Sequence, residues 1–167
     1  EIIGTDTVEK IKTDRRTMKA DCVVLALGIR PNTEFLAESG IEMTPRGLIK
    51  VDSSMRTNDE NIYAAGDCVT VANRITKTAV WSPMGSSANI EGRLLAQVLT
   101  GEKKRYEGVL GTGVCKLPEL NVGRTGLTET AAKEAGYDVI SVVAVVDYKA
   151  HYYPGASLFI IKMTAKR

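Results

Sequence analysis

The sequence predicts a mixed fold of the α/β class, α+β overall, and three observations lead to this prediction. Short apolar runs bounded by Gly, Pro or charged residues recur along the chain, as strands do. One long stretch near the middle has the apolar spacing of a helix. With 44% hydrophobic residues in 167, the composition is that of a globular protein. The 22 basic and 20 acidic residues leave a net charge of +2, which argues against a disordered chain or a strongly basic nucleic-acid binder.

The first part of the chain is expected to contain two strands and a short helix. The strands cover residues 7–12 and 21–27, and the second is almost continuously apolar, which is typical of a strand buried on both faces. Thr33 can cap a helix over residues 34–38, and Gly40 can end it.

Two further strands are expected over residues 48–52 and 61–65. Gly66 and Asp67 directly follow the second of these strands. In open α/β sheets, ligands bind outside the carboxyl ends of the strands. Gly66 and Asp67 are therefore candidate ligand-binding residues, although an isolated Gly-Asp pair can equally serve only as a turn.

The strongest helix of the chain is expected over residues 83–100, with Ser82 as its N-cap and Gly101 after its end. Its apolar residues recur at helical spacing and predict one stripe that packs on a sheet, with Glu91 and Arg93 facing elsewhere. The stripe consists of Ile90, Leu94, Leu95, Val98 and Leu99.

The charged segment 101–105 is expected to link to a second structural unit. In that unit, a helix over residues 128–135 has Thr128 as its cap and Gly136 as its stop. Strands are expected over residues 113–115, 121–126, 138–146 and 158–163.

The cysteines and the hydropathy pattern predict a cytoplasmic location and argue against disulfide bonds and a metal site. Cys22, Cys68 and Cys115 are odd in number and far apart, so neither a disulfide framework nor a metal site is expected. The longest apolar runs are much shorter than the roughly 18 to 20 residues of a membrane span. We therefore expect a cytoplasmic protein that binds neither membranes nor nucleic acids.

Three blocks of sequence resemble the FAD-dependent pyridine nucleotide-disulfide oxidoreductases, in the order in which that family has them. Residues 61–68, Asn-Ile-Tyr-Ala-Ala-Gly-Asp-Cys, resemble the second flavin signature. Residues 27–33 resemble the return from the NAD(P)-binding domain to the FAD domain, and residues 82–89 resemble the start of the flavin-facing helix. Residues 151–156, His-Tyr-Tyr-Pro-Gly-Ala, resemble the interface motif of coenzyme A-disulfide reductases and related NADH oxidases and persulfide reductases.

This resemblance implies parts of three domains. Residues 1–29 would end an NAD(P)-binding domain, residues 30–104 would form the C-terminal half of a Rossmann-like FAD-binding domain, and residues 105–167 would begin an α+β dimerisation domain. No G-x-G-x-x-G follows a predicted strand, and no cysteine lies in the family's N-terminal redox context. We therefore expect the chain to be a C-terminal piece of a longer protein.

The resemblance also implies which residues contact cofactor. The carboxylate of Asp67 would accept hydrogen bonds from the ribityl hydroxyls of FAD, and Gly66 would let the backbone approach. Met84, Gly85 and Ser86 would direct helix N-terminal amides at the flavin, although small residues there can also reflect close helix packing. Gly28 is a further candidate, in the block 27–33 that resembles the return from the NAD(P)-binding domain to the FAD domain.

In the resembled coenzyme A-disulfide reductases, the first Tyr of the interface motif reaches the other subunit's active site, which makes Tyr152 the catalytic candidate in a homodimer. Without that motif, tyrosines beside a turn are usually surface packing, and His151 is expected to be a solvated turn residue. Cys68 is expected to be structural, because the neighbouring carboxylate of Asp67 disfavours its thiolate.

The expected function is therefore that of an FAD-dependent enzyme that passes electrons from NAD(P)H to a disulfide, persulfide or oxygen species. A water- or peroxide-forming NADH oxidase or a ferredoxin- or rubredoxin-type reductase is the alternative, since the flavin blocks are widely shared. A different class of hypothesis is that the isolated chain is an inert scaffold or dimerisation piece that holds FAD weakly or not at all.

Overall fold

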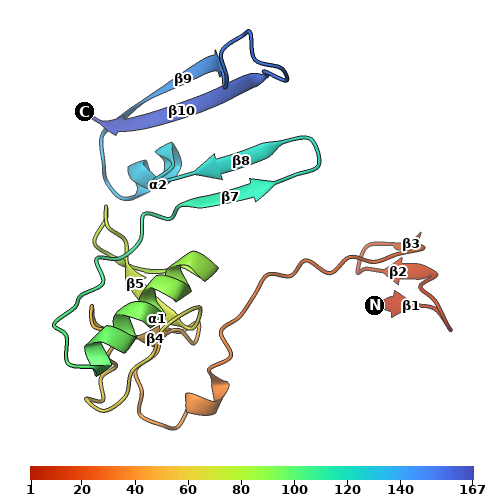
Figure 1. Cartoon of the computed structure of the whole chain (residues 1–167). Helices are drawn as coiled ribbons and strands as arrows, with labels where there is room; N and C mark the ends of the chain where they lie inside the picture. The colour runs from red at the N-terminus through yellow and green to blue at the C-terminus, as the bar shows by residue number, and fades with distance from the viewer. The chain divides into compact units, whose positions relative to one another are not determined.

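The computed structural model describes all residues 1–167 and divides them into two compact units, Glu1–Arg30 and Pro31–Arg167 (Figure 1). The predicted mixed α/β class is confirmed, with two α-helices and several small sheets. The domain boundaries near residues 29 and 104 stay predictions.

The N-terminal unit contains a small antiparallel sheet of the strands β1 (Ile2–Ile3), β2 (Lys10–Lys12) and β3 (Thr17–Lys19). The predicted strand over residues 21–27 is wrong, because this segment pairs with nothing and its apolar side chains are exposed, Leu27 by 88%. A strand buried on both faces needs neighbouring strands and covering layers, and no other part of this unit supplies them.

The second unit is built around a three-stranded sheet of β4 (Ile49–Lys50), β5 (Val69–Ala72) and β6 (Ala79–Trp81). β4 and β5 are parallel, whereas β5 and β6 are antiparallel with Thr70 opposite Trp81. The hydrophobic core lies against this sheet. Its buried members are Ile41, Ile49, Met55, Val69 and Val71.

Two predictions before this sheet need correction. The helix expected over residues 34–38 is a single 3-10 turn, Glu34–Leu36. Thr33 does not cap it with its side chain, because the Thr33 hydroxyl donates a hydrogen bond to the Gly47 carbonyl instead.

The predicted strand over residues 61–65 is also wrong. Its only pairing is an isolated bridge between Tyr63 and Arg56. Residues 66–68 therefore form a turn that precedes β5 rather than one that follows a strand. The sequence pattern did not predict β5 and β6.

The helix α1 (Gly85–Leu99) lies against β4 and β5 (Figure 1). Its N-cap is Met84 and not Ser82, because the Ser82 hydroxyl lies 3.0 Å from the Ser87 hydroxyl and caps no backbone amide. The predicted orientation of Glu91 is wrong: this side chain belongs to the packed face and is 1% exposed. The packed positions, in order, are Ser87, Ala88, Glu91, Leu94, Leu95 and Val98, while Ile90 and Leu99 are exposed.

The C-terminal elements agree with the prediction. The hairpin β7 (Gly113–Lys116) and β8 (Asn121–Arg124) precedes the helix α2 (Glu129–Glu134). The hydroxyl oxygen of Thr128, the predicted cap of α2, accepts the Ala131 N–H at 3.2 Å. A second hairpin follows, in which the long strands β9 (Val139–Asp147) and β10 (Leu158–Lys166) pair antiparallel along their whole length.

Candidate functional site

The turn at Gly66 and Asp67 exposes an unpaired carboxylate. Gly66 has φ +92°, a left-handed conformation that strongly favours glycine. Asp67 is exposed, and its carboxylate makes neither a hydrogen bond nor an ion pair within residues 1–167. This carboxylate can therefore accept hydrogen bonds from a ligand.

Two elements hold this turn from different directions. From α1, the Glu91 carboxylate accepts the Gly66 N–H, with 2.7 Å between the nitrogen and Oε2. From β6, the Trp81 indole N–H donates to the Asp67 carbonyl at 2.8 Å. The Arg46 guanidinium lies over the Trp81 ring, 5.1 Å from its centroid, and this cation–π contact helps to hold the Trp81 side chain in place. The backbone on both sides of the turn is therefore anchored.

The N-terminus of α1 offers free backbone donors beside this turn. Met84 is extended (φ −129°, ψ 128°), and no side chain caps the helix. The N–H groups of Gly85 and Ser86 have no acceptor within the chain, as at any uncapped helix start. A Cβ at Gly66 would lie 3.7 Å from the Cβ of Ala88, so the turn approaches the first turn of the helix. The structure thus brings the Gly66–Asp67 turn and the start of α1 together.

The inner side of the turn is buried and lacks a positive partner. Burial raises the pKa of Glu91, and the negative charge of Asp67 adds to this effect, while the hydrogen bond from Gly66 opposes it. Burial likewise raises the pKa of Cys68, and the charges of Glu91 and Asp67 raise it further. Burial also raises the pKa of Tyr106. Cys68 is therefore a thiol at neutral pH, as expected, and is not an activated nucleophile.

Glu91 is the residue of this region that the sequence analysis missed. A signal for it existed, because it lies four residues after Ser87 and three before Leu94, on the stripe that packs. A charged residue on a stripe is ordinarily assigned to the solvent side. The stripe that was predicted from apolar residues alone was therefore shifted around the helix.

Tyr152 lies in the turn between β9 and β10, away from any bonding partner. Its side chain is 75% exposed, and its ring lies beside the rings of its neighbours His151 and Tyr153, each at 5.4 Å between centroids. The turn is stabilised by the Tyr148 hydroxyl, which donates to the Gly155 carbonyl at 2.9 Å. No hydrogen bond connects Tyr152 with Asp67 or with α1.

Gly28 lies in the other unit, Glu1–Arg30. Its φ of +79° favours glycine, and a Cβ there would meet no atom within 4 Å. Backbone conformation therefore accounts for this glycine without a ligand.

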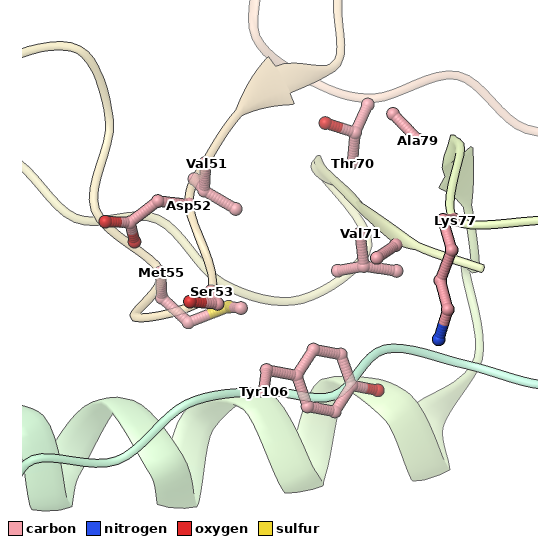
Figure 2. Close-up of a pocket in the computed structure, with 10 residues that line it drawn as sticks. Val51, Asp52, Ser53, Met55, Thr70, Val71, Lys77, Ala79 and Tyr106 are labelled. Carbon is pink, nitrogen blue, oxygen red and sulfur yellow. The ribbon is translucent and has the colours of Figure 1, made fainter. Parts of the chain in front are cut away.

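A separate cavity of about 210 Å³ lies near β5 (Figure 2). Val51, Thr70, Lys77 and Tyr106 are among its lining residues, and none of the predicted site residues reaches it. It is smaller than the roughly 300 Å³ at which small-molecule sites begin. We assign no ligand to it.

No helix of the structure has both the length and the apolar character that crossing a membrane requires.

A sheet with a helix N-terminus and a free carboxylate beside it provides the groups with which α/β proteins bind nucleotide-like ligands. Residues 1–85 match the family model described as pyridine nucleotide-disulphide oxidoreductase, and the chain belongs to this family. The resemblance found in the sequence is thereby confirmed.

Named relatives refine this family assignment. The chain is 40% identical over 154 residues to the NAD(P)H sulfur oxidoreductase (CoA-dependent) of Pyrococcus furiosus, covering 92% of this chain and 35% of that protein. It is 34% identical to an NADH oxidase of Methanocaldococcus jannaschii, covering 97% and 36%. A solved NAD-dependent persulfide reductase from A. fulgidus is similar with a TM-score of 0.85 and 38% identity, covering 90% and 28%. The chain spans about a third of the length of these curated relatives.

Proposed function

We propose that these residues belong to a flavoprotein that passes electrons from NAD(P)H through FAD to a persulfide or disulfide. The single observation that carries this proposal is the exposed, unpaired Asp67 carboxylate beside the uncapped start of α1. Membership of the pyridine nucleotide-disulphide oxidoreductases supports it. The relatives named for sulfur and persulfide reduction support this class of acceptor.

The free groups of this site suit the two polar parts of FAD. Asp67 would accept hydrogen bonds from the ribityl hydroxyls, and the left-handed Gly66 leaves the backbone open to close approach. Gly85 and Ser86 would present amide donors and the positive end of the helix dipole to the pyrimidine edge of the flavin, whereas the N–H of Met84, the third predicted residue, already donates to the Ser82 carbonyl at 2.8 Å. Bound FAD would accept hydride from NAD(P)H and supply the electrons for reduction. The chain's own part is to bind and orient it.

The remaining assignments are carried by the sequence resemblance. Residues 1–29 would close an NAD(P)-binding domain that includes Gly28, and residues 30–104 and 105–167 would belong to FAD-binding and dimerisation domains. Tyr152 would act in the active site of the second subunit of a homodimer, where its hydroxyl can donate a hydrogen bond or a proton to a departing thiolate. Its free, exposed hydroxyl group is compatible with that role.

The test is the variant Asp67→Ala in the full-length protein. We expect FAD to bind about tenfold or more weakly, since charge-assisted hydrogen bonds to hydroxyls are lost. The measurement is the flavin-to-protein ratio after purification and a titration of apoprotein with FAD. Asp21→Ala is a matched control, because Asp21 is also exposed but lies in the other unit, Glu1–Arg30. Unchanged FAD binding in Asp67→Ala would refute the proposal.

An NADH oxidase is the second candidate, favoured by the 34% identity to the Methanocaldococcus jannaschii protein of that name. Steady-state assays with NADH and either oxygen, coenzyme A disulfide or polysulfide separate the two. A faster turnover with oxygen than with either sulfur compound would favour the oxidase. Tyr152→Phe should lower the rate with the sulfur acceptors and leave flavin reduction by NADH unchanged.

A further inference from the structure

Glu91 is a charged side chain in a place where charges are costly. It is 1% exposed, and no Lys or Arg forms an ion pair with it. The groups that face it are Asp67 and Cys68 on the turn and Tyr106 on the segment after α1. None of them carries a positive charge. An unpaired buried carboxylate is unfavourable for folding unless hydrogen bonds compensate it, so the position calls for an explanation.

The hydrogen bond from the Gly66 N–H explains why a carboxylate is present at this position. It joins the Glu91 Oε2 to a backbone N–H that lies 25 residues away in the chain, at 2.7 Å. Gly66 is the residue with φ +92°, directly before Asp67. A charged acceptor makes this bond stronger than a neutral one would. Together with the Trp81 bond to the Asp67 carbonyl, it restrains the Ala65–Gly66 and Asp67–Cys68 peptide units, which flank the Gly66–Asp67 pair.

We propose that Glu91 is a positioning residue for the cofactor: its carboxylate holds the Gly66 N–H and thereby fixes the direction in which Asp67 presents its own carboxylate. This inference rests on the proposed function, since it assumes that Asp67 binds FAD. Glu91 does not touch the cofactor; it acts through the turn. A turn that is fixed before binding loses less conformational entropy when the ligand arrives, which favours affinity.

Variants of Glu91 separate the hydrogen bond from the charge. Glu91→Gln keeps a carbonyl oxygen at the same reach, so FAD affinity should stay within about threefold of the wild type. Glu91→Met has a similar length but no strong acceptor, and it should weaken FAD binding by about tenfold. Glu91→Ala gives a second variant without an acceptor, in case Glu91→Met fails to fold.

A matched control accounts for general destabilisation of the helix. The control variant is Leu94→Ala. Leu94 follows Glu91 on the same face of α1 and packs against the hydrophobic core, but its side chain makes no hydrogen bond to the Gly66–Asp67 turn. The variant should lower stability and leave FAD affinity within about threefold of the wild type.

Hydrogen exchange of the Gly66 amide in the FAD-free protein measures directly whether the turn is restrained. In the wild type and in Glu91→Gln, the Gly66 amide should exchange slowly, and in the two variants without an acceptor it should exchange at least about tenfold faster. Fast exchange of Gly66 in the wild type would overturn the inference whatever the variants do.

The outcomes distinguish this inference from the proposed function. If Asp67→Ala weakens FAD binding while Glu91→Met binds FAD like the wild type, Glu91 is not a positioning residue and the flavin site stands. If Leu94→Ala weakens binding as much as Glu91→Met, the effect is one of stability and the inference is also wrong. If Asp67→Ala has no effect, the proposed function itself fails.

Discussion

Glu91 on α1 and Glu129 on α2 occupy opposite electrostatic surroundings. Glu91 is buried beside the Asp67 turn without a cation, and burial raises its pKa. Glu129 pairs with Lys133 on its own helix and with Lys162 on β10, the latter at 2.6 Å. Hydrogen bonds, first from Lys133 and then from Lys162, lower the pKa of Glu129 to about 2. Ionisation of the same side chain is therefore unfavourable in one region and favourable in the other.

The two regions also differ in how their strands are stabilised. The sheet of β4, β5 and β6 has short strands, but their side chains form the buried core with Met55. The β9–β10 hairpin has the longest ladder in the chain, yet its apolar side chains, such as Ile160 at 68% and Phe159 at 52%, are largely exposed. Packing holds the first region, and backbone hydrogen bonds between paired strands hold the second.

The largest expected difference between the regions comes from truncating side chains. Met55→Ala should lower the free energy of unfolding by about 2–5 kcal/mol, because it empties a site that is 1% exposed. Phe159→Ala should cost less than about 1 kcal/mol, because half of its side chain already faces solvent. Urea denaturation of the two variants measures both values. Equal losses would break the comparison and mean that other residues cover the β10 face in the intact protein.

The next effect concerns the buried charge. Because the folded state binds the Glu91 proton more tightly than the unfolded state, Glu91 takes stability away as the pH rises from its ordinary pKa near 4.5 through its raised value. Glu91→Gln removes this loss, so its stability relative to the wild type should increase between pH 4 and pH 7. Denaturation curves at both pH values test this. Glu102→Gln, on the surface, is the control and should show no such increase.

The smallest change in stability is expected for the half-buried, ion-paired Glu129, and its dependence on pH is opposite to that of Glu91. The pKa of Glu129 is lowered, so its contribution is present above pH 4.5 and is lost as the pH falls towards about 2. Glu129→Gln should therefore be less stable than the wild type at pH 7, and this difference should shrink as the pH falls through about 2. Added salt should shrink the difference at pH 7, because the pairs with Lys133 and Lys162 are exposed. A difference that grows on acidification would contradict this assignment.

Local signals were sufficient for part of the fold. The helix α1 was predicted to within two residues at each end, and the cap of α2 was predicted down to the hydrogen bond of Thr128. The hairpin strands β7 to β10 also follow from their apolar runs. Helices and hairpins are formed by contacts between residues close in sequence, so a pattern in a short window suffices.

Apart from the N-cap of α1, the failures concern partners that lie far away in the chain. The apolar runs 21–27 and 61–65 have the composition of strands, but neither finds a neighbouring strand to complete a ladder. The burial of Glu91 was missed because its partner, the Gly66 amide, lies 25 residues earlier. Composition alone cannot reveal whether such a partner exists.

Family membership, the candidate pair Gly66 and Asp67 and the approximate extent of α1 were recognisable from residue order alone, because motifs and helical periodicity are properties of contiguous sequence. The attachment of that turn to Glu91 and Trp81, and the burial that raises the pKa of Glu91, arise only when α1 and β6 pack around it. Desolvation depends on all the atoms that surround a charge, and residues from several separate segments supply those atoms.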